Sequence, residues 1–239
     1  MAVCQVCFRH CDLQEGRTGF CGARVCRDGE VTAANYGRIT SLALDPIEKK
    51  PLARFHPGSL ILSVGSYGCN LRCPFCQNHE ISWSARAFSQ AENAEVITPQ
   101  ELAETAAYYR SRGNIGLAFT YNEPLIGWEF VRDTARLVHE RGMVMNLIRE
   151  AVTFCHVELT TLIVPGENDS PEEMEELSAW IAGLTDVCEG ASGRDIPLHV
   201  SRFFPRFHMT DRPPTDVGRV YQLAETARKR LRYVYTGNC

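Results

Sequence analysis

The chain has 239 residues and a formal net charge of −4 at pH 7, with 44% hydrophobic and 23% charged residues. These values are ordinary for a soluble globular protein of one large domain, or of one domain with a small appendage. No apolar run reaches membrane-spanning length and no signal-peptide pattern opens the chain, so we expect no membrane partner. The chain also lacks a basic block, which leaves nucleic-acid binding without support.

The eleven cysteines are many for an intracellular enzyme. Eight of them fall into two clusters whose spacings are typical of metal sites, and the total is odd. Both facts indicate metal ligation in a reducing compartment rather than a disulfide framework. We therefore expect a cytoplasmic, oxygen-sensitive protein.

The first cysteine cluster lies in a glycine-rich segment that has few large apolar residues, so a metal is its natural organiser. The C-x2-C-x3-C-x9-C pattern is enough for a closed four-thiolate site formed by Cys4, Cys7, Cys11 and Cys21. Zinc and a [4Fe–4S] cluster fit it equally well, Cys26 could replace one ligand, and free cysteines in a flexible arm are the alternative. We assign residues 1–58 to a cysteine-rich N-terminal segment with a short β hairpin, ahead of a larger domain, residues 59–239.

Strands and helices alternate along the chain with short connections, which is typical of βα units and a parallel sheet. The expected strands are residues 31–34, 38–42, 60–64, 115–120, 143–147, 157–164, 198–201 and 233–235. The expected helices are residues 99–112, 128–141, 171–184 and 216–230. We predict an α/β fold, a partial, open (β/α) barrel with the cysteine-rich appendage, and we expect its chemistry at the C-terminal ends of the strands.

One junction does not fit a regular barrel. The strand ending near Leu147 and the strand starting at Val157 are separated by only about nine residues, whereas a parallel crossover needs a dozen or more. We therefore expect one βα repeat to be absent there.

The second cysteine cluster, Cys69, Cys73 and Cys76, has C-x3-C-x2-C spacing directly after an apolar strand. Thiolates this close together bind zinc or an iron–sulfur cluster. Most protein-bound [4Fe–4S] clusters take four cysteines, so three would leave one iron with an open position, as in catalytic metal sites. The alternative is a closed structural zinc site completed by His79, three residues after Cys76.

Three further segments follow predicted strands. Glu123, in the run Thr-Tyr-Asn-Glu-Pro, could hydrogen-bond an ammonium group at the strand ends, or it could simply favour a helix N-terminus. Residues 164–169 and residues 199–205 follow or end later predicted strands. Without a functional role, the first segment would be an ordinary turn, and His199 in the second would be a structural histidine.

The C-x3-C-x-aromatic-C pattern after a strand resembles that of the radical S-adenosylmethionine (SAM) enzymes. The resemblance implies a [4Fe–4S] cluster whose open iron is chelated by SAM, and one-electron reduction that cleaves SAM to methionine and a hydrogen-abstracting 5′-deoxyadenosyl radical. The cofactor carries this chemistry, while the protein orients it and excludes water.

The same resemblance implies the cofactor-binding residues, although it indicates no catalytic side chain. Phe75 is placed to pack near the adenine, and Glu123 matches the Gly-Gly-Glu-Pro segment that binds the SAM amino group. The other implied cofactor contacts are Asn122, Asn146, Pro165, His199 and Arg202.

The closest likeness is to the activating enzymes exemplified by pyruvate formate-lyase activase, and among them to the AmmeMemoRadiSam system radical SAM enzymes. It is carried by the N-terminal cysteines, residues 45–52, residues 121–124 and residues 201–205. It implies glycyl radical formation on a partner protein, and a flavodoxin- or ferredoxin-type electron donor. The alternatives are a radical SAM enzyme with a small-molecule substrate, and a zinc-stabilised binding protein.

Two departures from this family fall near Leu147. The Thr-Asn-Gly turn and the following strand with its Asp-x-x-Lys motif, whose lysine often contacts the SAM carboxylate, are missing; the chain has only Lys49, Lys50 and Lys229. Either the chain is a genuine deletion variant with a weakened SAM site, or residues are missing from the sequence.

Overall fold

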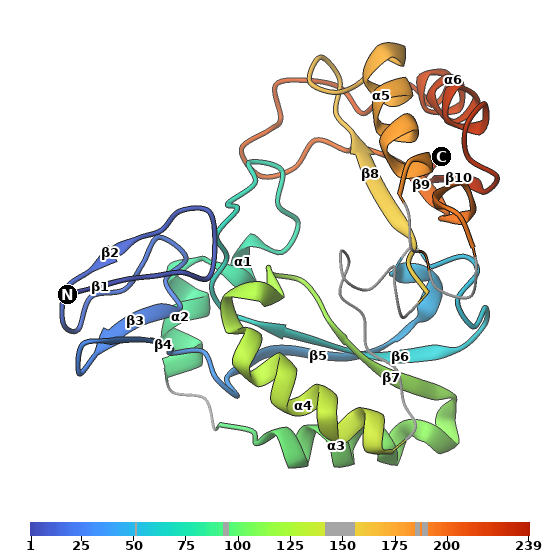
Figure 1. Cartoon of the computed structure of the whole chain (residues 1–239). Coiled ribbons are helices and arrows are strands. Elements are labelled where there is room, and N and C mark those ends of the chain that lie inside the picture. The colour runs from blue at the N-terminus through green and yellow to red at the C-terminus, as the bar shows by residue number, and fades with distance from the viewer. Residues whose placement is uncertain (51, 93–95, 142–155, 185–186, 188–190) are drawn as a thin grey trace. The chain divides into compact units, whose positions relative to one another are not determined.

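The computed structural model of the chain describes residues 1–50, 52–92, 96–141, 156–184, 187 and 191–239 (Figure 1). The chain forms two compact units, each described here by itself: Met1–Asp45 with Ser59–Met145, and Pro46–Gly58 with Asn146–Cys239. The boundary predicted at residue 58, between a cysteine-rich segment and a barrel, stays a prediction.

Two short antiparallel hairpins open the first unit. They are formed by β1 (Ala2–Val3) with β2 (Asp12–Leu13), and by β3 (Arg24–Arg27) with β4 (Glu30–Ala33). Asp28 and Gly29 connect β3 to β4 with φ of 52° and 78°, the left-handed pair that a tight two-residue hairpin turn requires. Cys4, Leu13 and Cys26 make up the small buried core of this region.

A three-stranded sheet with the order β5-β6-β7 follows in the first unit. Its strands are β5 (Ile39–Pro46), β6 (Leu60–Ser66) and β7 (Asn114–Phe119), with β6 and β7 parallel. Two helices, α3 (Pro99–Tyr108) and α4 (Trp128–Glu140), lie together on the same side of β6 and β7 (Figure 1). Leu62 and Val64 of β6 pack in one core cluster with residues of both helices. Because side chains alternate along a strand, Ser63 and Gly65 lie on the opposite face of the sheet.

Local chemistry explains where the helices of this unit begin and end. Thr98 caps α3 and shares a reciprocal capping box with Glu101, as predicted. The short helix η2 (Tyr109–Arg112) continues α3 until Gly113, which stops it at a φ of 91°. Three short helices were not predicted: α1 (His79–Ser82), α2 (Ala85–Glu92) and η3 (Pro124–Gly127).

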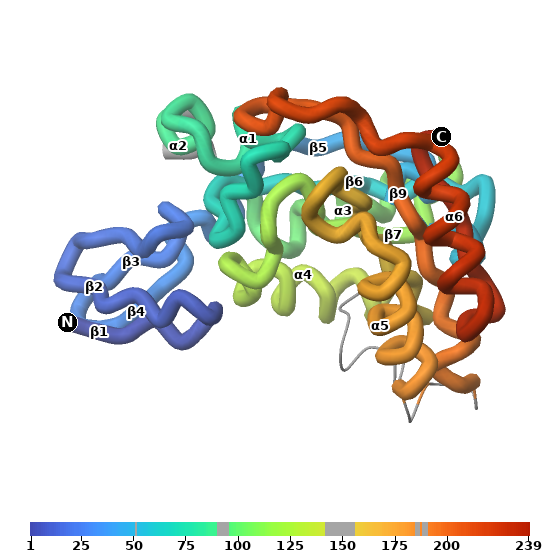
Figure 2. Tube along the Cα trace, turned by 90° about the horizontal axis from the view of Figure 1, so that it is seen from above, coloured from blue at the N-terminus to red at the C-terminus, as the bar shows by residue number. Residues whose placement is uncertain are grey.

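The second unit contains an all-parallel sheet with the order β10-β9-β8. Its strands are β8 (Leu159–Ile163), β9 (Leu198–Arg202) and β10 (Val234–Gly237). The helices α5 (Pro171–Ala182) and α6 (Val217–Arg228) run side by side (Figure 2) and share one buried apolar cluster with the strands. The short helices η1 (Ile47–Lys49) and η6 (Gly193–Asp195) complete this unit.

The predicted α/β fold with parallel strands is confirmed. The described strands form small sheets rather than a clearly closed barrel. The predicted strand 143–147 and the short junction beside Leu147 lie outside the described residues. In the part of the chain that the structure covers, no helix is both long and apolar enough to cross a bilayer.

Candidate functional site

The three cysteines of the second cluster occupy one loop, directly after β6 and before α1. Cys69 is buried, and Cys73 and Cys76 are half-buried; none of the three is in a disulfide. The Cys76 amide donates to the Cys73 carbonyl oxygen at 3.1 Å. Burial first, and then the thiols of Cys76 and Cys69, raise the pKa of the Cys73 thiol. The Cys73 sulfur therefore lies within electrostatic reach of the other two.

Gly68 sets the entry of the chain into this loop. Its φ is +87°, and a Cβ added there would lie 2.5 Å from the Cβ of Ala23. Its amide bonds to the Ser82 carbonyl at the end of α1, and the Cys69 amide donates to the Cys21 carbonyl at 3.2 Å. Only glycine can adopt this φ without strain and fit the space beside Ala23. The residue before the first cysteine therefore has to be glycine.

Two arginines hold the N-terminal segment beside the loop. Arg72 donates to the Phe20 carbonyl at 2.9 Å, and Arg9 donates to the Asn70 carbonyl at 2.9 Å. Both guanidinium groups lie over the Phe20 ring, at 4.7 Å and 3.5 Å from its centroid.

The donor set of this loop fits a cluster better than a single ion. Within the described ranges, no group of three or more His, Cys, Asp or Glu side chains is placed to hold one metal ion. A zinc ion needs all its ligands around one point, and the described side chains of this loop, His79 included, form no such group. Cluster thiolates bind different irons, so that single-ion requirement does not apply to them. Three soft sulfur donors on one loop suit an iron–sulfur cluster in which one iron has no protein ligand.

The N-terminal cysteines are also partly gathered. The Cys4 amide donates to the Cys11 carbonyl at 2.9 Å. Burial and the nearby thiols of Cys4 and Cys7 raise the pKa of Cys21, although backbone amides act in the opposite direction. Cys26 is fully buried, with its sulfur 3.8 Å from a Glu15 carboxylate oxygen. A metal at Cys4, Cys7, Cys11 and Cys21 stays a prediction.

The loop after β7 is tied directly to the cysteine loop. The side-chain amide of Asn122 donates to the Gly68 carbonyl at 2.9 Å and accepts from the Ser66 amide at 3.2 Å. Asn122 therefore fixes the end of β6 against the loop after β7. Glu123 is half-buried, and its carboxylate accepts from the Leu125 amide at 3.1 Å, which caps η3.

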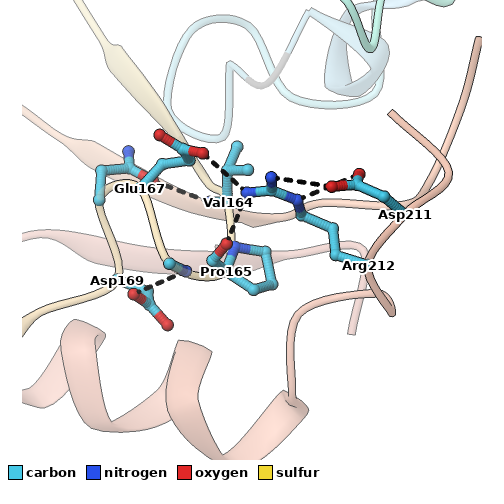
Figure 3. Close-up of polar contacts among 8 residues, drawn as sticks. Val164, Pro165, Glu167, Asp169, Asp211 and Arg212 are labelled. Atoms are coloured by element: carbon cyan, nitrogen blue, oxygen red, sulfur yellow. Dashed lines mark hydrogen bonds and ion pairs between the residues drawn. The ribbon is translucent and has the colours of Figure 1, made fainter. Parts of the chain in front are cut away.

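In the second unit, residues 164–169 form a closed turn after β8 (Figure 3). Asn168 accepts from the Val164 amide at 2.8 Å and donates to the Leu162 carbonyl at 3.0 Å. Arg212 reaches the same turn from the segment after β9, donating to the Pro165 carbonyl at 2.9 Å and to Glu167 at 2.8 Å. Pro165 therefore sits in a turn that is closed on both sides.

The two predicted residues of β9 lie at different ends of the strand. His199 is its second residue, and its Nε2 lies 2.7 Å from a Glu158 oxygen just before β8. Arg202 is its last residue and donates to the Thr215 carbonyl at 2.7 Å. Parallel sheets of this class carry chemistry at the carboxyl ends, which favours Arg202 over His199 as a cofactor contact.

The structure places Phe75 half-buried in the cysteine loop. Asn146 lies outside the described residues. The cysteine loop and residues 122–123 lie in one unit, and residues 165, 199 and 202 in the other. Their meeting at one cofactor stays a prediction.

Three residues with functional interest had been missed. Glu158 has a fully buried side chain, and Arg212 donates a hydrogen bond to the Pro165 carbonyl in the turn after β8. Asp45 is 7% exposed and bonds both Ser63 and Tyr121. A charged residue inside or beside an apolar strand was the available clue for Glu158 and Asp45.

Comparisons with known proteins agree with the geometry of the cysteine loop. A family model described as "Radical SAM superfamily" matches residues 63–180. An uncharacterized protein of Methanocaldococcus jannaschii is 33% identical over 282 residues, which cover 98% of this chain and 80% of that protein. The 282 aligned positions exceed the 239 residues of this chain, so the relative has residues inside the aligned region that this chain lacks.

Proposed function

Because the chain belongs to the radical SAM superfamily, we propose that it is an activase-like enzyme, which uses SAM to form a glycyl radical on a partner protein. Membership of the superfamily implies a [4Fe–4S] cluster and SAM. When bound, the cluster supplies the electron that cleaves SAM and so starts hydrogen abstraction. The observation that carries the proposal is the loop with three free, mutually close cysteines after β6.

In this proposal, the chain's own residues would bind the cluster and orient SAM. Cys69, Cys73 and Cys76 would hold the cluster through their thiolates, and with only three protein ligands the cluster would keep a position open to SAM. Asn122 holds the cysteine loop against the loop after β7, so that Glu123 can accept a hydrogen bond from the SAM amino group. An ammonium–carboxylate bond of this kind is charge-assisted and therefore strong.

The substrate proposal rests on the likeness to the activating enzymes. A protein loop can reach the radical only if the enzyme surface is open. We propose that the chain folds as an open (β/α) barrel that lacks one repeat. A flavodoxin- or ferredoxin-type protein in the cytoplasm would supply the electron.

The N-terminal cysteines form a second metal site in this proposal, with zinc or a second cluster at Cys4, Cys7, Cys11 and Cys21. Their side chains would have to move closer together to surround a single zinc ion, because no described group of three or more such side chains is placed to hold one. The proximity of Cys21 to Cys4 and Cys7 supports it.

The function is tested by anaerobic reconstitution with iron and sulfide, reduction, and addition of SAM. We expect 5′-deoxyadenosine and methionine in equal amounts. A candidate partner added before reduction should then acquire a glycyl-radical EPR doublet; deoxyadenosine without that doublet on any partner would favour a small-molecule substrate. Metal analysis of anaerobically purified protein that gives zinc near two equivalents and no iron would contradict the radical chemistry and favour a zinc-stabilised binding protein.

A further inference from the structure

Tyr121 has an unusual backbone conformation for its residue type. Its φ is +72°, in the left-handed region where side chains with a Cβ are strained and glycine is not. Strained positions of this kind persist only when surrounding contacts determine them, and they cluster at functional sites. In this chain, the strained residue comes directly before Asn122 and Glu123.

The contacts that hold Tyr121 come from the strands β5 and β6. Its hydroxyl donates to a carboxylate oxygen of Asp45 at 3.0 Å, and the same oxygen accepts from the Ser63 hydroxyl at 2.8 Å. Asp45 is 7% exposed and Ser63 is fully buried, so these bonds are shielded from water. Burial, and next the bond to Asp45, raise the pKa of the Tyr121 hydroxyl further above neutral pH, so the hydroxyl is protonated and can donate to Asp45.

The ring of Tyr121 also fills a space that Gly65 leaves open. A Cβ added at Gly65 would lie 2.8 Å from Cδ2 of Tyr121. Gly65 and Ser63 are on the face of the sheet opposite to α3 and α4. The side chain of Tyr121 therefore runs along that face, held by the ring at Gly65 and by the hydroxyl at Asp45.

The conformation of Tyr121 decides where the next two residues point. A change of φ from the left-handed region to the ordinary range would redirect the chain and break the bonds of Asn122 to Ser66 and Gly68. It would also change the direction in which the Glu123 side chain points. A glycine at this position would adopt the left-handed conformation without strain. For Tyr121, the hydrogen bond to Asp45 compensates for that strain.

We propose that Asp45 and Tyr121 are a positioning pair, which holds the loop after β7 in the shape that presents Glu123 to the SAM amino group. The proposal rests on the proposed function. It also gives a role to Asp45, the first residue of the segment 45–52.

The test uses anaerobically reconstituted protein with an oxidised cluster, so that SAM binds without being cleaved. Tyr121→Phe should weaken SAM binding in equilibrium dialysis about tenfold, the size expected for a lost bond to a buried carboxylate, with unchanged iron and sulfide content. After reduction, the KM for SAM should rise while kcat changes little. Tyr121→Gly should bind SAM more tightly than Tyr121→Ala, because glycine alone tolerates the φ of +72°.

Tyr36→Phe is the matched control. It removes a similar bond, 2.8 Å long, from a tyrosine hydroxyl to the Asp133 carboxylate in the same unit, and it should leave SAM affinity unchanged. Equal affinity of Tyr121→Phe and wild type, or of the glycine and alanine variants, would overturn the positioning role.

Hydrogen exchange of residues 120–127 without SAM separates the two proposals. Faster exchange in Tyr121→Phe than in Tyr36→Phe is expected, and equal exchange would overturn the pair as the support of this loop. If the wild type itself binds no SAM, the proposed function fails, while the exchange rates still decide whether the pair holds the loop.

Discussion

Cys73→Ala is expected to reduce SAM cleavage to the level of a protein-free control. Removing one of three thiolates leaves a cluster with too few ligands, and Cys73 lies between the other two in the loop and within reach of both. Iron bound per chain after anaerobic reconstitution should fall with it. The readouts are 5′-deoxyadenosine by chromatography and the absorbance of the cluster.

Cys239→Ala is the control for Cys73→Ala. Cys239 is exposed and belongs to neither cysteine cluster, so its loss should leave both the iron content and the cleavage rate at wild-type values. If Cys73→Ala cleaves SAM as fast as the wild type does, these three cysteines do not hold the catalytic cluster.

Glu158→Gln is expected to cause the largest loss of stability, about 3–5 kcal/mol in the free energy of unfolding, as for a broken buried charge network. The carboxylate is unexposed and accepts five hydrogen bonds. The donors are the amides of Ala53, Arg54 and Phe55 at 3.0, 2.8 and 3.0 Å, and the Nε2 atoms of His156 and His199 at 3.0 and 2.7 Å. A glutamine would place its own N–H groups against some of these donors.

The stability that Glu158 contributes should depend on pH in one direction. Burial by itself would raise its pKa, but the bonds from the two histidines and the backbone amides lower it well below the ordinary value of 4.5. A lowered folded pKa means that the contribution is complete above the unfolded value and is lost as the pH falls through the folded one. The difference between wild type and Glu158→Gln should therefore shrink below about pH 4.5.

Urea unfolding at pH 7 and at pH 4 measures both effects. Glu225→Gln is the control, since Glu225 is an exposed carboxylate on α6 with a single arginine partner; its loss should change the free energy of unfolding by less than about 1 kcal/mol. A similarly small change for Glu158→Gln would show that this buried cluster does not hold residues 53–55 to the unit.

Local sequence features predicted most of the regular elements. The capping box of Thr98 with Glu101 and the left-handed Gly113 fixed the bounds of α3 and η2, because both act within one turn of the chain. The helix α1 was missed since it has four residues and Asn78 makes no side-chain cap bond. The strands β1 and β2 have two residues each, too few for any periodicity.

The candidate site was predictable only where its chemistry is local. The spacing of Cys69, Cys73 and Cys76 spans eight residues and was recognised. The bond between Asp45 and Tyr121 joins residues 76 apart. The bonds of Glu158 to the amides of residues 53–55 join residues more than 100 apart. Contacts at these separations depend on how strands are paired, which no spacing rule encodes, so the partner of His199 could not be foreseen.

In the proposed function, three thiolates hold a [4Fe–4S] cluster and leave one iron for SAM. The most direct measurement is the EPR spectrum of the reduced, reconstituted protein recorded with and without SAM. We predict that SAM shifts the g values of the cluster signal, because it becomes a ligand of that iron. A spectrum that stays the same at saturating SAM, or a protein that forms no such signal, would contradict the account.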